Sequence, residues 1–257
     1  MTTLLLPPRH TPDSQLIWRA AIAAGWPTVR LPAWSVPRDL GTRDLAFYGE
    51  PLLAAHVAEV LNLRMIEPQL DWLITVPREY LHRDVRFGNL AEARRLTSRT
   101  FVKPADEKAF RAQIYANGAA IDASELYEPT LPVLMIEPVS FATEYRCFVL
   151  ERRIETFCLY CRAGEVVEVP ATDDPGAGAA RAFAETILVD ARVFLPPAVV
   201  LDVGQLADGR WAVIECNPAW GSGIYACDAT RVLPVLKRAC VPVENADAEN
   251  PRAFARR

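Results

Sequence analysis

Hydrophobic positions in the first third of the chain alternate between short strand-like runs and amphipathic helical stretches. Thr11, Pro12 and Asp13 form a capping sequence with proline at a first helical position, which predicts a helix to about Ala24. A second helix opens at Glu50–Pro51, because apolar residues then recur at helical spacing. Apolar runs predict strands at 3–6, 28–31 and 65–68. This order of elements predicts a small parallel sheet with helices on both faces.

The pattern changes to one dominated by strands from Thr100 onward. Strands are predicted at 101–104, 110–115, 132–139, 144–151 and 153–162, and helices at 177–190 and from the Asp228 cap to about Ala239. Residues 69–99 lie between these two patterns and are rich in arginine: Arg78, Arg83, Arg86, Arg94, Arg95 and Arg99. We interpret this segment as a solvated helical connector, with an electropositive wall facing an anionic ligand as the alternative.

A hairpin at 198–218 carries the most informative chemistry of the chain. Two strand-like runs flank Asp208–Gly209, a dipeptide typical of a two-residue turn. With a tight, unbulged turn, Asp202 lies directly opposite Glu215, and Asn217 points to the same face two residues later. Two facing carboxylates repel, so we expect positive charge between them. Three oxygen donors on a rigid platform suit Mg²⁺, whereas the alternative is a polar hairpin with incidental acidic residues.

Composition narrows the class of protein further. A net charge of −4 over 257 residues argues against a dedicated nucleic-acid binder, although nucleic acid is not excluded as a substrate. We expect a cytoplasmic protein with no membrane association, because no signal peptide or long apolar segment is evident. Cys158 and Cys161 have the CxxC spacing of zinc sites. They fall three apart in a predicted strand and so face opposite sides, which favours buried structural thiols.

Several short motifs follow one another in a characteristic order. They are Phe101-Val102-Lys103-Pro104, Glu137-Pro138-Val139, Glu144-Tyr145-Arg146, Leu201-Asp202-Val203-Gly204 and Glu215-Cys216-Asn217-Pro218. In this order they resemble the ATP-grasp superfamily. More narrowly, they resemble a bacterial ATP-grasp domain family formerly described as a domain of unknown function. The resemblance implies an ATP-grasp fold of mixed α/β and α+β class, with a small N-terminal α/β lobe and two α+β lobes enclosing the nucleotide. The corresponding ranges are 1–99, 100–137 and 138–241, followed by a flexible tail at 242–257.

The resemblance also assigns roles to residues that would bind ATP. Lys103 at a strand end corresponds to a lysine that contacts phosphates. Glu137 and Val139 correspond to the hinge that pairs with adenine, and Glu144 to the carboxylate that binds the ribose hydroxyls. Arg162 either joins the nucleotide site or is a surface arginine.

The remaining implied roles concern catalysis and metal binding. Arg146 corresponds to the arginine that contacts the γ-phosphate or an acyl phosphate. Lys108 lies where the superfamily has a glycine-rich flap, and Lys108 with Arg111 would supply by charge what glycine amides supply elsewhere. Asp202, Glu215 and Asn217 correspond to the ligands of one or two Mg²⁺ ions.

The function implied is an ADP-forming carboxylate–amine ligase, or one using another nucleophile, that acts through an acyl phosphate. Its partners would be a small carboxylate and an amine, for example an amino acid or peptide. The sequence fixes neither these acceptors nor the oligomeric state. Trp220 and Tyr225 either line the acceptor pocket or pack in the core. Two alternatives stay open: a phosphotransferase that uses the same ATP site, and a non-catalytic nucleotide-binding module.

Overall fold

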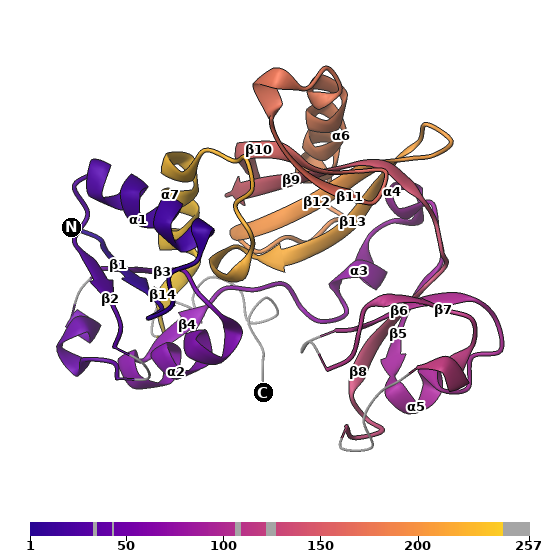
Figure 1. Ribbon diagram of the computed structural model, residues 1–257, viewed down its shortest axis with the longest axis horizontal. Helices are drawn as coiled ribbons and strands as arrows, with labels where there is room; N and C mark the ends of the chain where they lie inside the picture. The colour runs from indigo at the N-terminus through magenta and orange to yellow at the C-terminus, as the bar shows by residue number, and fades with distance from the viewer. Residues whose placement is uncertain (33–34, 43, 106–108, 122–126, 244–257) are drawn as a thin grey trace.

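The computed structural model describes residues 1–257 apart from 33–34, 43, 106–108, 122–126 and 244–257. Within these residues the chain forms three lobes, which Figure 1 shows as an N-terminal lobe, a central four-stranded sheet and a C-terminal five-stranded sheet. No helix in the described part of the chain is long and apolar enough to span a membrane. Most of the predicted tail, 244–257, lies outside the described residues.

The N-terminal lobe is built on a parallel sheet of order β2-β1-β3. Its elements are β1 (Thr3–Leu6), α1 (Pro12–Ala23), β2 (Thr28–Arg30), the 3₁₀ helix η1 (Arg38–Thr42), β3 (Leu45–Phe47), α2 (Pro51–Leu61) and β4 (Leu63–Met65). Thr11 caps α1 in a reciprocal capping box with Ser14, so the predicted helix start is confirmed. The predicted parallel sheet is also confirmed.

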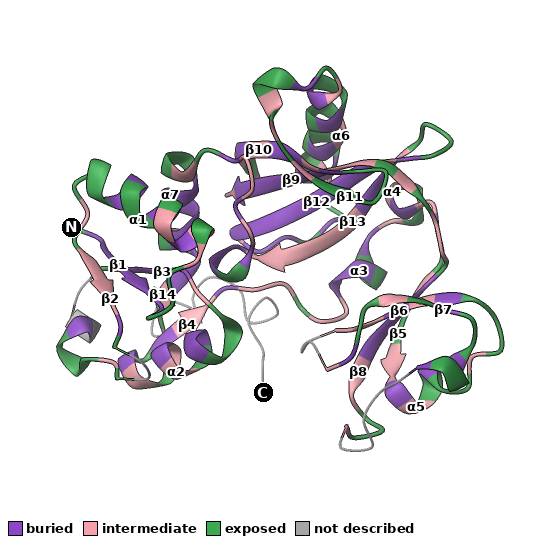
Figure 2. Ribbon diagram, in the orientation of Figure 1, coloured by how far each residue is buried: buried purple, intermediate pink, exposed green. Residues whose placement is uncertain are grey.

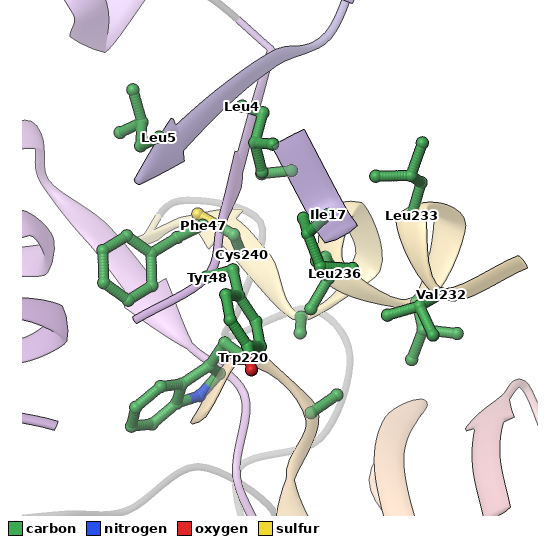
Figure 3. Packing of buried hydrophobic residues seen from close by; sticks show 14 of the residues in the cluster. Leu4, Leu5, Ile17, Phe47, Tyr48, Trp220, Val232, Leu233, Leu236 and Cys240 are labelled. Carbon is green, nitrogen blue, oxygen red and sulfur yellow. The ribbon is translucent and has the colours of Figure 1, made fainter. Parts of the chain in front are cut away.

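The last helix of the chain completes this N-terminal core. The helix α7 (Ala229–Arg238) packs against α1 and β3, and β14 (Cys240–Pro242) pairs with β4. Figure 3 shows Leu233 and Leu236 of α7 close to Ile17, with Trp220 beside Tyr48. The first and last parts of the chain therefore share one hydrophobic core.

The central lobe is an antiparallel sheet of order β5-β8-β6-β7. Its elements are β5 (Val85–Asn89), α5 (Leu90–Ala93), β6 (Thr100–Pro104), β7 (Gln113–Tyr115), η2 (Gly118–Ala120) and β8 (Pro132–Ile136). Two short helices, α3 (Trp72–Thr75) and α4 (Arg78–Leu81), precede β5. Residues 85–89 are thus an edge strand of the central sheet, not the helical connector that the arginine-rich pattern indicates.

The C-terminal lobe is a sheet of order β11-β10-β9-β12-β13. Its elements are β9 (Phe141–Leu150), β10 (Arg153–Arg162), β11 (Glu165–Pro170), η3 (Ala171–Asp173), α6 (Ala177–Val189), β12 (Ala198–Leu206), β13 (Trp211–Pro218) and η4 (Ala219–Gly221). Helix α6 covers one face, where Figure 2 shows its buried side toward the sheet. Helix α7 covers Phe148 and Val200 on the other face. Strand alternation places Arg146 and Asp202 on that second face, beyond the part covered by α7.

The turn of the β12–β13 hairpin differs from the predicted one. A three-residue loop, 207–209, replaces the two-residue Asp208–Gly209 turn. It is closed by hydrogen bonds from the Leu206 N–H to the Arg210 carbonyl and from the Gly209 N–H to the Leu206 carbonyl. Gly209 adopts a φ of +89°, the left-handed conformation that such loops require at their last position. The prediction of the turn was therefore wrong by one residue.

A β-bulge nevertheless restores the predicted register where it matters. Near the turn Gln205 pairs with Trp211, one residue out of the predicted register. The pairing then skips Ile214, so that two residues of β13 oppose one of β12. Beyond the bulge Asp202 lies opposite Glu215, as predicted. The register at the acidic pair is confirmed because the longer loop and the bulge compensate each other.

Gly204 of β12 is required by close packing beside this bulge. A Cβ at this position would lie 2.7 Å from the Thr143 carbonyl oxygen and 2.9 Å from Cδ1 of Ile214. We expect Gly204→Ala to lower the free energy of unfolding by about 1–3 kcal/mol, because the neighbouring backbone would have to move. Gly178→Ala in α6 is the matched control, since a Cβ there meets nothing within 4 Å, and it should be neutral or stabilising by up to about 1 kcal/mol. Urea unfolding measures both, and equal stabilities of the two variants would contradict the expectation.

Candidate nucleotide and metal site

A cavity of about 1460 Å³ lies between the central sheet and the C-terminal sheet. Apolar side chains of both sheets form its walls, among them Phe101, Ile136, Phe141 and Ile214. The predicted site residues that line it are Lys103, Arg111, Glu137, Val139, Glu144, Glu215 and Asn217. The two sheets thus bring together residues that are more than 100 positions apart in the sequence.

A chain of polar contacts crosses the base of this cavity. Lys103 Nζ at the end of β6 lies 2.5 Å from Glu215 Oε2 on β13. The Asn217 amide nitrogen lies 2.8 Å from Glu215 Oε1 and 3.3 Å from Asp202 Oδ2. Arg146 on β9 completes the chain with two bonds to Asp202, of 3.0 Å from Nε and 2.6 Å from one terminal nitrogen. The positive charge that the facing carboxylates required therefore comes from a lysine and an arginine, one for each carboxylate.

Arg146 and Asp202 form a buried ion pair behind the cavity lining. Asp202 is fully buried, and the Arg146 side chain is nearly so. Burial raises the pKa of Asp202, and the Arg146 guanidinium opposes this shift. Burial acts to lower the pKa of Arg146, but the Asp202 carboxylate outweighs it and raises that pKa. A two-point bond to a guanidinium favours the ionised carboxylate at neutral pH.

Two tyrosines hold the Arg146 guanidinium in place. The Tyr160 and Tyr225 rings stack with centroids 5.2 Å apart, and the Arg146 Cζ lies 5.1 Å from each centroid. Burial raises the pKa of both phenols, so they remain neutral donors. The Tyr160 hydroxyl donates to Glu144 Oε2 at 2.6 Å, which joins the predicted ribose carboxylate to the same cluster. Sequence reasoning missed Tyr160, whose role depends on a loop far along the chain.

Glu215 is the carboxylate of the pair that faces the cavity. Burial raises its pKa, but the ion pair with Lys103 and the bond from Asn217 outweigh this and lower the pKa to about 2. Glu215 is therefore ionised throughout the physiological pH range. An ionised carboxylate held by a lysine at a cavity base is a site where phosphates and a divalent cation can be handled together.

The donor set fits Mg²⁺. Two carboxylates and one side-chain amide are oxygen donors of the kind that this ion prefers. Among the described residues no three His, Cys, Asp or Glu side chains are grouped to hold a metal, so the amide of Asn217 would supply the third donor. Glu215 and Asn217 line the cavity, whereas Asp202 lies behind them against Arg146. The cavity-lining pair is thus the more accessible part of the set.

The other predicted residues differ in how far the structure places them at the cavity. The Glu137 N–H donates to the Asp84 carbonyl at 2.8 Å, and Glu137 Oε2 accepts from the Asp84 N–H at 2.9 Å. Arg162 pairs with Asp174 at 3.0 Å and lies outside the residues that line the cavity. Lys108 lies outside the described residues. The nucleotide roles of all three remain predictions.

The aromatic residues after Pro218 separate into two environments. Trp220 is buried in the N-terminal core, where its indole N–H donates to the Ile66 carbonyl at 3.0 Å. Tyr225 stacks beside Arg146. Of the two interpretations offered by the sequence, core packing therefore applies to Trp220, while Tyr225 belongs to the polar cluster.

Comparisons with known proteins agree with this geometry. A family model described as an ATP-grasp domain, the second family of its clade, matches residues 80–235, more than half of the chain. The RimK domain ATP-grasp protein from Sphaerobacter thermophilus DSM 20745 has a similar structure, with a TM-score of 0.57 and 15% identity over 92% of this chain and 99% of that one. The macrocyclase MdnC from Microcystis aeruginosa MRC, solved with its precursor peptide MdnA, gives a TM-score of 0.49 and 13% identity, with the same coverage. The search of curated proteins gave no match.

The fold and the inter-sheet cavity define an ATP-binding protein of the ATP-grasp class. The chain belongs to the ATP-grasp domain family whose model matches residues 80–235. The predicted fold class is confirmed, and the comparisons support an ATP-grasp enzyme in general terms.

Proposed function

We propose that this chain is an ADP-forming ligase that activates a carboxylate as an acyl phosphate and transfers the acyl group to an amine or another nucleophile. The observation that supports this most is the polar chain from Lys103 through Glu215 and Asn217 to Asp202 and Arg146 at the base of the cavity. It places two cations and two carboxylates where the phosphates of a bound nucleotide would react.

The proposed roles follow from the position of each residue along the cavity. Lys103 binds the phosphates as a point charge at the end of β6. Glu215 and Asn217, with Asp202 behind them, hold one or two Mg²⁺ ions, which when bound neutralise charge on the phosphates. Glu144 binds the ribose hydroxyls, and the backbone at Glu137 and Val139 faces the adenine. Each of these residues except Asp202 lines the cavity.

Arg146 is the proposed catalytic cation. Its guanidinium is fixed by Asp202, by the Gly223 carbonyl at 3.3 Å and by two tyrosine rings. A cation that is already oriented needs no reorganisation as negative charge develops on a transferred phosphoryl group. This rigidity suits stabilisation of an acyl phosphate at the far end of the cavity.

The test measures ADP and free phosphate released from ATP with pools of amino acids, dipeptides and other small carboxylates. A ligase releases phosphate only when a carboxylate and a nucleophile are both present. A phosphotransferase instead leaves a stable phosphorylated product. Binding of ATP with no turnover on any pool would favour the non-catalytic module.

Glu215→Gln is the appropriate inactive control. We expect at least about a 100-fold loss of turnover, because the substitution removes the ionised carboxylate at the cavity base. Asp202→Asn is less suitable, since Asp202 is buried against Arg146 and its loss also disturbs folding. Equal turnover in the wild type and Glu215→Gln would overturn the metal assignment.

A further inference from the structure

Arg83 is a buried arginine in the short connector between α4 and β5. Only 4% of its surface is exposed, and it lines the cavity. Its guanidinium donates to three backbone carbonyls: Leu81 at 3.0 Å, Val213 at 2.7 Å and Ile214 at 3.0 Å. The Cζ also lies 5.5 Å from the centroid of the Phe141 ring. The arginine-rich pattern had indicated a solvated connector or a wall facing a ligand, whereas this side chain binds the protein's own backbone.

Two of these carbonyls belong to the β-bulge that sets the acidic register. Ile214 is the residue that the β12–β13 pairing skips, and Glu215 follows it directly. Because β13 is an edge strand, its outer carbonyls have no neighbouring strand to hold them. The Arg83 fork occupies them, and so fixes the bulge from which Glu215 projects.

The same connector is part of the hinge between the central and C-terminal lobes. Asp84, next to Arg83, exchanges two hydrogen bonds with Glu137, where the chain returns from the central lobe. The two crossings between the lobes are therefore tied together, and Arg83 attaches them to β13. Burial lowers the pKa of Arg83 to about 10, with the nearby Glu215 carboxylate acting in the opposite direction, so the guanidinium stays charged at neutral pH.

We propose that Arg83 is a positioning residue that holds the β13 bulge and thereby sets Glu215 and Asn217 in place for Mg²⁺. The proposal rests on the function proposed above. It assigns to Arg83 no contact with the nucleotide. Its expected signature is a change in the Mg²⁺ requirement of ATP binding that is larger than any change in the affinity for ATP at saturating Mg²⁺.

The experiment compares Arg83→Lys and Arg83→Gln with Arg152→Lys and Arg152→Gln. Arg152 is a matched control, because its guanidinium also donates to three backbone carbonyls, those of Leu188, Asp190 and Val193, outside the cavity lining. Titration calorimetry gives ATP affinity at a series of Mg²⁺ concentrations. Hydrogen–deuterium exchange of residues 211–218 without any ligand reports on the bulge itself.

We expect Arg83→Lys to keep the positive charge, lose the fork and raise the half-saturating Mg²⁺ concentration roughly 10–100-fold, with faster exchange in 211–218. The Arg152 variants should leave both measurements unchanged. An Arg83→Lys variant with the Mg²⁺ requirement and exchange of the wild type overturns the inference alone. Wild-type ATP binding that ignores Mg²⁺ overturns the metal assignment and this inference together. If Arg83→Gln does not fold, Arg83→Lys decides.

Discussion

Arg146→Leu should lower the free energy of unfolding by about 3–5 kcal/mol and abolish measurable turnover of ATP. The stability loss follows from burial, because Asp202 is fully buried and would lose both hydrogen bonds from the guanidinium. A carboxylate left without its cation in this environment costs far more than the ion pair itself contributes. Urea unfolding and ADP formation measure the two effects separately.

A double variant separates folding from chemistry at this pair. In Arg146→Met/Asp202→Leu both charges are gone, so much of the lost stability should return, as is common when a buried pair is replaced by apolar groups. Turnover should stay absent, because the proposed catalytic cation is still missing. A double variant as unstable as Arg146→Leu would show that the buried charge is not the cause of the loss.

Arg181→Ala provides the surface comparison for the same lobe. Arg181 pairs with Glu185 at 2.7 Å on α6, with both side chains about half exposed. Exposed pairs of this kind contribute little, so the variant should stay within about 0.5 kcal/mol of the wild type with full turnover. A large loss in this variant would mean that ion pairs in general, and not burial, govern the stability of the lobe.

The parts of the site that could be predicted from the sequence are those set by local patterns. Lys103 ends an apolar run, and strand alternation alone places Asn217 on the same face as Glu215. The register of Asp202 against Glu215 was also predicted correctly, although from a turn that the structure does not have. A three-residue loop with an αL glycine and a bulge at Ile214 together give the same pairing. A loop one residue longer without that bulge would have turned Glu215 to the opposite face.

What could not be predicted depends on contacts between distant segments. Arg83 looks like its arginine neighbours in the sequence, and only the carbonyls of residues 213–214 show that it is buried. The β5 strand, which begins at Val85, is recognisable only through its pairing with β8. Asp202 reads as a metal ligand equal to Glu215, yet the structure commits it to Arg146 and leaves Glu215 and Asn217 at the cavity surface.

Lys103→Met should weaken ATP binding roughly 10–100-fold, which corresponds to about 1.5–3 kcal/mol for a lost hydrogen bond to a charged group. In the wild type Lys103 Nζ lies 2.5 Å from Glu215 Oε2 and faces the cavity, so the variant loses both a phosphate contact and the cation beside Glu215. Lys237→Met is the matched control, because Lys237 pairs with Asp44 at 2.8 Å on the N-terminal lobe. It should leave the ATP affinity unchanged.

The same substitution should change how stability depends on pH. Burial raises the pKa of Glu215 while Lys103 and Asn217 lower it to about 2, below the ordinary value of about 4.3 for an unfolded glutamate. The stabilisation from this depressed pKa is therefore complete above about pH 4.3 and is lost as the pH falls toward 2. Without Lys103, burial acts with less opposition and the pKa of Glu215 rises. The stability advantage of the wild type over Lys103→Met should consequently be largest near pH 7, at about 1–2 kcal/mol for this partly exposed pair, and should shrink below about pH 4. Urea unfolding from pH 7 to pH 3.5 measures this advantage, and one that does not change with pH would show that Lys103 does not set the charge of Glu215.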